Sequence, residues 1–330
     1  MPSAIALLRF ALSILVTLPL SGCILVSANL NPFAAEPQPL EERVVSGEGK
    51  AKVLLIDIAH VITAEDEDEA FGIRHRDSTT ARVQQELEQA AKDDDVRAIV
   101  LRINSPGGTV TASDIVYQQI MDFKAQQHVP VVAQMLDMAT SGAYYIALAA
   151  DEIVASPTTV TGSVGVVMFG VNLSGLMEKI GVTNQTLTAG AHKDLGSPLR
   201  KMAPEERAIL QSVLDAMQQR FLSIVRERRP EATAETLQTI ADGRVLVADQ
   251  ALQARLVDRI GYLDDAVGIA TRQAGETTAR VVMYRRPQEY AENIYSRATT
   301  GAAQMNLVNF DLGGLGLAAP QFLYMWMPGH

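Results

Sequence analysis

Short apolar runs and amphipathic stretches alternate along most of this chain. Residues 52–58 and 97–104 are apolar at both odd and even positions, which is typical of strands buried on both faces of a parallel sheet. Residues 79–95 and 113–127 repeat their apolar positions every three or four residues, as the buried stripe of a helix does. The same patterns predict strands at 129–135, 153–156 and 279–284 and helices at 141–150, 171–180 and 204–228. This alternation predicts an α/β fold with right-handed crossovers.

The N-terminal segment has the pattern of an export signal. A weakly positive start with Arg9 is followed by a short apolar stretch that ends in Leu-Ser-Gly before Cys23, the only cysteine of the chain. Residues 20–23 resemble a bacterial lipobox, in which the cysteine is acylated and becomes the new N-terminus. An uncleaved transmembrane anchor over residues 4–30 is the alternative, although the apolar run is short for a span. Both interpretations place the rest of the chain on the outer side of a bacterial membrane, which is the periplasmic face in a Gram-negative host.

Composition and proline content predict four parts along the chain. Residues 1–22 are the predicted lipoprotein signal peptide, and the proline-containing residues 23–50 are a predicted tether from the lipidated Cys23. Residues 51–285 form the predicted folded domain, and residues 286–330 a C-terminal extension. With 330 residues, 48% of them hydrophobic, the chain can bury a large core. The net charge of −10 argues against a nucleic-acid partner, because phosphate binding needs clustered Lys and Arg.

Two segments carry the candidate chemistry. Ser141 lies among small residues at the start of a predicted helix, and Lys193 lies in the glycine-bounded segment 190–198. Serine is a poor nucleophile until a base takes its proton, and a lysine is such a base only when it is neutral. A lysine side chain in water has a pKa of about 10.4, and burial disfavours its charged form. The sequence therefore suggests a Ser–Lys dyad, with the Asp194 carboxylate pointing away from the amine.

Glycines flank the candidate nucleophile. The first N–H groups of a helix at Gly142 have no helical partner and suit a developing oxyanion, and residues 104–108 (Asn-Ser-Pro-Gly-Gly) are predicted to turn after a strand and offer a second donor. Each feature alone has a plainer interpretation: a helix N-cap for Ser141, an ordinary turn for 104–108 and an exposed side chain for Lys193. A Ser–His–Asp arrangement also stays open, with His192 as the histidine nearest a motif.

Four segments in the same order resemble the bacterial signal peptide peptidase A (SppA) family. They are residues 104–108, 140–145, 161–165 and 192–200, and the resemblance extends from about residue 52 to about residue 275. The resemblance implies a Clp protease/crotonase-like fold, which is a parallel-sheet spiral core surrounded by helices. The folded domain at 51–285 would then be a peptidase domain.

The family resemblance also implies roles for individual residues. Ser141 would attack the scissile carbonyl, Lys193 would be the general base, and Ser163 would orient the lysine amine. The N–H groups of Gly108 and Gly142 would form the oxyanion hole. No metal and no cofactor are implied.

The implied substrates are remnant signal peptides and other hydrophobic or extended peptides, bound as strands. The implied assembly is a homo-oligomeric ring with inward-facing active sites, in which a neighbouring subunit can line each site. Two alternatives remain: a catalytically inactive, lipid-anchored, peptide-binding scaffold of the same fold, and a hydrolase or lyase acting on small acyl substrates.

The C-terminal tail departs from the family pattern. Residues 301–330 extend past the usual domain, and residues 322–326 hold an aromatic patch that includes the only tryptophan. This patch either packs on the protein's own surface or an oligomer contact, or docks near an active-site groove as a product-like peptide. Docking predicts that deletion after Gly314 raises peptidase activity or lowers KM.

Overall fold

The computed structural model describes residues 39–69, 74–287, 294 and 322–326. Its elements are β1 (Glu41–Ser46), β2 (Lys52–Ile62), β3 (Glu67–Glu69), β4 (Arg74–Arg76), α2 (Thr79–Ala90), β5 (Val96–Thr109), α3 (Val110–Gln127), β6 (Val131–Thr140), α4 (Gly142–Ala147), β7 (Glu152–Ala155), β8 (Val160–Gly162), β9 (Val167–Met168), α5 (Ser174–Lys179), α6 (Pro204–Arg228), α7 (Ala234–Ile240), β10 (Val245–Val247), α8 (Ala248–Gln253), β11 (Arg259–Ile260), α9 (Leu263–Gln273), β12 (Arg280–Arg285) and β13 (Phe322–Met325).

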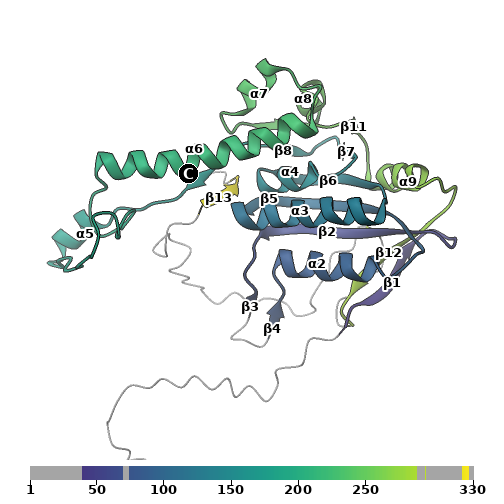
Figure 1. Cartoon of the computed structure of the whole chain (residues 1–330), viewed down its shortest axis with the longest axis horizontal. Helices are drawn as coiled ribbons and strands as arrows, with labels where there is room; N and C mark the ends of the chain where they lie inside the picture. Colours follow the sequence, from purple (N-terminus) through teal and green to yellow (C-terminus); the bar gives the residue numbers. More distant parts are fainter. Residues whose placement is uncertain (1–38, 70–73, 288–293, 295–321, 327–330) are drawn as a thin grey trace, which may run out of the picture. The chain divides into compact units, whose positions relative to one another are not determined.

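A mixed sheet forms the centre of the fold (Figure 1). Its main order is β1-β12-β2-β5-β6-β7-β11, and every neighbouring pair from β12 to β11 is parallel. β1 closes one edge by pairing antiparallel with β12. Beyond the main path, β8 continues beside the end of β6, and β13 pairs with β5 and β9. The α/β class predicted from the alternating pattern is confirmed.

Helices cover both faces of this sheet. Along β2, Leu54, Ile56 and Ile58 share one buried cluster with residues of α2, α3 and α4. The alternate positions Val53 and Leu55 pack in a second cluster with residues of α9. Successive side chains of a strand point to opposite faces of the sheet. A strand that is apolar at both odd and even positions is therefore buried on both faces. Each fully buried Leu or Ile contributes about 1.5–3 kcal/mol.

The turn predicted at residues 104–108 is wrong, because these residues lie within β5. The strand continues through Pro106 to Thr109, and Gly107 and Gly108 pair in register with Val61 and Ile62 of β2. A Cβ atom added at Gly108 would lie 1.9 Å from the Ile62 carbonyl oxygen, so the backbones approach more closely there than any side chain allows. The two glycines therefore serve close strand packing, and the chain does not reverse until α3.

Two segments from outside the predicted folded domain join the sheet. Residues 41–46, within the predicted tether, form β1, and residues 322–325 of the predicted C-terminal extension form β13. The predicted signal peptide and Cys23 lie outside the described residues. Within the described ranges, no helix has both the length and the apolar character that a membrane span needs.

A buried ionic group links three strands of the sheet. Arg102 of β5 donates two hydrogen bonds to the Asp57 carboxylate of β2, at 2.5 and 2.8 Å, and Arg285 of β12 pairs with the same carboxylate. The two arginine side chains are each 3% exposed. Burial by itself raises the pKa of Asp57, but the Arg102 hydrogen bond and the Arg285 charge hold that pKa below its usual value.

We expect Asp57→Asn to lower the free energy of unfolding by about 3–5 kcal/mol, because it leaves the buried Arg102 guanidinium without a carboxylate and takes from Arg285 one of its two, the other being Glu86. Urea unfolding at neutral pH measures this. A carboxyl group whose pKa is lower in the folded state than in the unfolded state stabilises the fold at higher pH. The difference in free energy of unfolding between wild type and Asp57→Asn therefore narrows as the pH falls through the folded-state pKa of Asp57. The control is Glu41→Gln, which breaks the exposed pair with Arg43 and changes stability by no more than about 0.5 kcal/mol. A loss at Asp57 no larger than at Glu41 contradicts the prediction.

Candidate active site

Ser141 lies at the junction between β6 and α4, in a strained backbone conformation. Its φ is 55° and its ψ is −116°, and the residue is 1% exposed. Its N–H donates to the Gly162 carbonyl at 2.8 Å, which ties the junction to the end of β8. A non-glycine residue in such a region costs about 1–3 kcal/mol and persists only where the surroundings enforce it. A strained serine between a strand and a helix is also how some hydrolases present their nucleophile.

The Ser141 hydroxyl is buried and has no hydrogen-bond partner among the residues that the structure describes. The hydroxyl of the preceding Thr140 is in the same state. An unsatisfied buried polar group costs about 1–3 kcal/mol, and a native structure that keeps one commonly does so for function. Strain and an unpaired hydroxyl at one residue together mark Ser141 as the candidate nucleophile.

Three glycines surround this serine. Gly142 begins α4, so its N–H is among those that lack a helical acceptor. An atom built at the Cβ position of Gly107, where φ is 104°, would lie only 2.9 Å from the Gly142 nitrogen. Gly108 follows in the same strand. The structure thus places Gly142 and Gly107 beside the serine, and the oxyanion roles of Gly108 and Gly142 stay predictions.

Ser163 is also near this junction. It directly follows Gly162, whose carbonyl accepts from Ser141, and its own N–H donates to the Arg244 carbonyl at 2.8 Å. Its side chain is largely buried, and its φ of 52° is again positive. The path of the chain thus brings Ser163 near the Ser141 junction, and its predicted action on a lysine amine stays a prediction.

Lys193 is exposed, on the segment between α5 and α6. Since the Ser141 hydroxyl has no partner within the described chain, a single subunit does not bring the two predicted dyad members together. His192 lies on the same segment and is also exposed, with Glu205 3.9 Å from its Nε2. Neither candidate base reaches the serine within one subunit.

Arg200 organises the segment that carries Lys193. It donates to the Asp194 carboxylate at 2.6 and 2.8 Å and pairs with Glu206 at the start of α6. These hydrogen bonds lower the pKa of Asp194 and lower that of Glu206 to about 2. The Asp194 carboxylate is therefore engaged by Arg200, in keeping with its expected direction away from the lysine.

A group of aromatic residues adjoining the site was not found from the sequence. Tyr145 of α4 packs against Phe221 of α6, with ring centroids 5.0 Å apart, and Tyr324 of β13 stacks on Tyr145 at 5.5 Å. Ser113 of α3 also lies here, since a Cβ added at Gly142 would be 2.3 Å from its Oγ. The sequence offered docking of the aromatic tail near the active-site groove as one of two alternatives, but it did not show that α4 and α6 would supply the rings that contact it.

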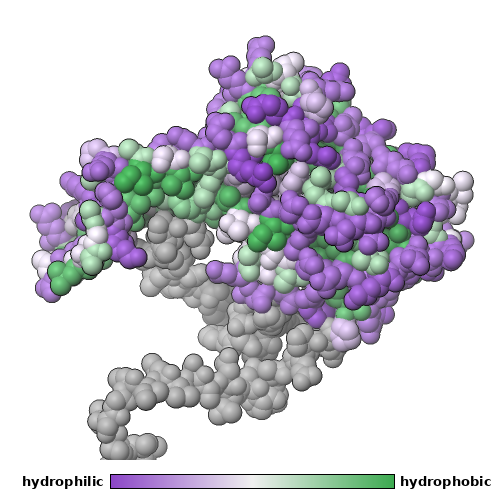
Figure 2. Space-filling model, viewed as in Figure 1, coloured by the Kyte–Doolittle hydropathy of each residue, from purple (hydrophilic) through white to green (hydrophobic). Residues whose placement is uncertain are grey.

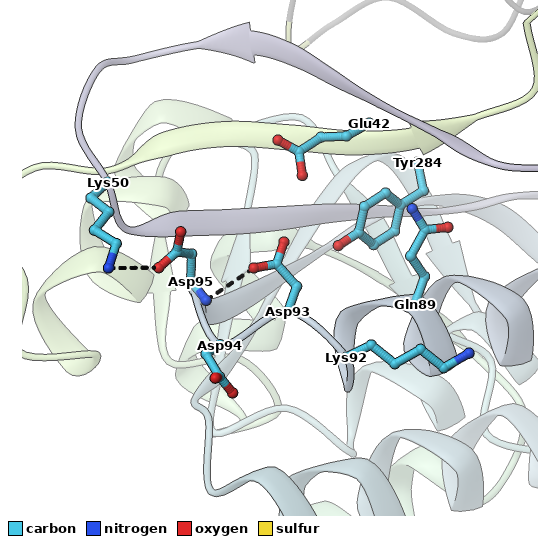
Figure 3. Close-up of a pocket in the computed structure, with 8 residues that line it drawn as sticks. All are labelled: Glu42, Lys50, Gln89, Lys92, Asp93, Asp94, Asp95 and Tyr284. Atoms are coloured by element: carbon cyan, nitrogen blue, oxygen red, sulfur yellow. Dashed lines mark hydrogen bonds and ion pairs between the residues drawn. The ribbon is translucent and has the colours of Figure 1, made fainter.

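A charged hollow lies at the other edge of the parallel sheet, where β2 and β5 begin (Figure 3). Its charges neutralise one another: Lys50 lies 3.3 Å from Asp95, and Lys52 lies 2.6 Å from Asp93 and 2.7 Å from Glu42. Ser141 follows the end of β6, at the opposite edge. The hollow therefore has no part in the site.

The sequence matches two protein-family profiles: peptidase family S49 over residues 123–276 and Clp protease over residues 66–161. It is 33% identical over 256 residues to a candidate signal peptide peptidase SppA of Enterococcus faecium, a match that covers 77% of this chain and 72% of that protein. It is 37% identical over 191 residues to Protease 4 of Salmonella typhi, covering 57% of this chain and 30% of that protein. A solved mutant of the 1510-N membrane-bound stomatin-specific protease superposes with a TM-score of 0.41 at 17% identity, covering 66% of this chain and 84% of that one.

The α/β architecture and the family matches define a serine peptidase with a Clp-like fold. The chain belongs to peptidase family S49. The resemblance to the SppA family that the four sequence motifs indicated is thereby confirmed, and so is the predicted fold class.

We expect Ser141→Ala and Ser141→Gly each to lower peptidase activity by at least about 10³-fold, because both remove the nucleophile. Neither variant is expected to lose stability. Alanine removes the unpaired hydroxyl, and glycine also adopts the positive φ without the cost of a Cβ atom. Hydrolysis of a fluorogenic peptide and thermal unfolding measure the two effects. Activity within tenfold of wild type would exclude Ser141 as the nucleophile.

Proposed function

We propose that this chain is a serine endopeptidase that degrades remnant signal peptides and other hydrophobic or extended peptides at a bacterial membrane. The observation that carries the proposal is the strained, buried Ser141 hydroxyl next to the first N–H of α4 and the glycines of β5. Family membership and the name of the Enterococcus faecium relative support the peptide substrate.

The proposed reaction begins when Ser141 Oγ attacks the scissile carbonyl while its proton passes to the Lys193 amine. The N–H groups of Gly108 and Gly142 stabilise the oxyanion, at about 2.7–4 kcal/mol for each donor. The lysine then gives its proton to the leaving amine, which leaves an ester on Ser141. Water, deprotonated by the same lysine, hydrolyses the ester and frees the serine.

We further propose that Lys193 acts on Ser141 of a neighbouring subunit in a homo-oligomeric ring. Exposed apolar side chains near Lys193 support a subunit contact here: Ile180 is 65% exposed, Val182 49% and Leu187 96%. Figure 2 shows hydrophobic surface along α6 and at α5, the helices that flank this segment. Burial of the lysine ammonium in such a contact disfavours its charged form, as a general base requires. Ser163 orients the amine.

Anchoring through an acylated Cys23, with the peptidase domain on the outer side of the membrane, is the proposed location. It rests on the lipobox-like residues 20–23 and on the short apolar run before them. Two or more acyl chains on one cysteine give stable membrane attachment, where a single chain is marginal.

Mixing two inactive variants tests the shared site. We expect Ser141→Ala and Lys193→Ala each to lose at least about 10³-fold in activity alone. Assemblies formed from both variants, purified through two different tags, recover activity, because a serine of one subunit meets the lysine of another. Lys201→Ala, on the same segment, is the matched control and keeps wild-type activity.

Two other outcomes would contradict a lysine base that comes from the neighbouring subunit. Activity retained by Lys193→Ala excludes the lysine and makes His192→Ala the next variant. Loss in both variants without recovery in the mixed assembly excludes a base supplied by the neighbour. With a lysine base, the wild-type rate rises with pH to a plateau on the alkaline side.

A further inference from the structure

The strand β5 carries a bulge directly before its two glycines. The pairing of β2 with β5 passes from residue 59 opposite residue 104 to residue 61 opposite residue 107, so His60 of β2 faces both Ser105 and Pro106. The backbone of His60 has a positive φ of 62° at this point. Bulges redirect a strand locally and are common next to active sites.

One buried hydroxyl holds this bulge. Ser105 is 1% exposed, and its Oγ donates to the His60 carbonyl at 2.5 Å. The same Oγ accepts the Gly107 N–H at 3.1 Å. Serine hydroxyls often bond to the backbone two residues further on, which fixes a local change of direction. The Ser105 side chain therefore joins the bulged residue of β2 to the first glycine of β5.

Ser105 also connects the bulge to the strand that carries the candidate nucleophile. Its backbone is the register partner of Ala139 in β6, two residues before Ser141. On its other side Ala139 pairs with Thr161 of β8, whose Oγ1 donates to the Ala139 carbonyl at 2.6 Å. The position of β6 before Ser141 is thus fixed from β8 and from β5, and on the β5 side the contact is made by Ser105.

The Ser105 hydrogen bond restricts the backbone that leads to the proposed oxyanion donor. Gly107 has a φ of 104° and no side chain to limit its conformation, so the hydrogen bond from its N–H to Ser105 Oγ holds it. That bond also engages the Gly107 N–H within the protein. Gly108 follows, and its N–H is the donor that the proposed reaction uses.

We propose that Ser105 is a positioning residue of the peptidase, whose hydroxyl fixes the bulge in β5 and so directs the Gly108 N–H at the oxyanion formed on Ser141. The proposal rests on the proposed reaction and adds the residue that holds one of its two donors in place. Ser105 acts through the glycine backbone and not by contact with the substrate. Loss of an oxyanion donor costs about 10²–10³ in kcat, and we expect a displaced donor to cost about 10–100-fold.

A peptide aldehyde tests this role, because it adds to Ser141 Oγ as a reversible hemiacetal whose oxygen takes the place of the oxyanion. Calorimetry measures how the full-length protein binds acetyl-Leu-Leu-leucinal and the matching alcohol, which cannot form that bond. We expect Ser105→Ala to weaken aldehyde binding about 10–100-fold and to leave alcohol binding within about twofold. Unchanged aldehyde affinity overturns the proposal, and so does an equal loss for the two ligands.

Two further variants separate positioning from a general loss of structure. Ser105→Thr keeps the hydroxyl and binds the aldehyde more tightly than Ser105→Ala, whereas a position that only requires a small side chain favours alanine. Ser156→Ala is the matched control, because it removes another hydroxyl that donates to a backbone carbonyl, that of Met135 at 2.9 Å, and it leaves both affinities unchanged. No gain from threonine, or an equal loss in the control, contradicts the positioning role.

Hydrolysis of a fluorogenic peptide by the same proteins separates this inference from the proposed function. If wild type binds the aldehyde more tightly than the alcohol but hydrolyses no peptide, the proposed function fails and the affinities still decide the role of Ser105. If Ser105→Ala hydrolyses peptides with the wild-type kcat, the proposed function stands and the positioning role fails alone. If wild type binds the aldehyde no better than the alcohol, Ser141 forms no adduct and both fail.

Discussion

The reversal of the chain at Ser141 is the constraint on which the site depends. β6 is buried in the sheet, α4 is buried beneath α3 and α6, and one residue with φ 55° and ψ −116° must join them. The reversal fits under β5 because Gly107 and Gly142 have no Cβ atoms, which would collide with the opposing backbone and with Ser113. The packing of β6 and α4 on either side of Ser141 enforces a backbone conformation that a serine would not otherwise adopt. The same packing keeps its hydroxyl free of protein partners and beside helix N–H groups.

Because the glycines of β5 have no Cβ atoms, the backbone of β13 can also approach closely here. β13 lies against Gly107 and Gly108 at distances where side chains would intervene, and its carbonyl comes to the start of α4. One geometric feature thus has two effects: it leaves the first N–H groups of α4 accessible and it lets an extended strand pair beside them. An enzyme that acts on extended peptides needs both at the same point, because strand pairing fixes which carbonyl faces the nucleophile.

Apolar periodicity predicted the elements that form the body of the fold, because β2, β6 and α6 bury apolar side chains at regular intervals. It failed at residues 105–109, where turn-forming residue types continue a strand whose pairing shifts register at this point; the cause is contact with β2, which is far away in sequence. The sequence motifs also singled out Ser141 and the glycine-containing segment 104–108, and the structure places Gly107 of that segment beside Gly142. The motifs could not place Lys193 relative to them, because that segment leaves the body of its own subunit and packs little of its apolar surface there. The aromatic group beside the site escaped prediction because its three rings come from α4, α6 and β13.

β5, which lies beside the Ser141 junction, is tied to β2 and β12 by the Asp57–Arg102–Arg285 group. Two buried apolar clusters pack on the same sheet, so movement of its strands would expose charge and core together. β13 is a strand of four residues that is held by its pairing with β5 and β9 and by the Tyr324 ring stacked on Tyr145. The conformation of Ser141 is therefore held by the most deeply buried part of the fold, and the strain at this residue persists because the sheet around it cannot shift without exposing that core.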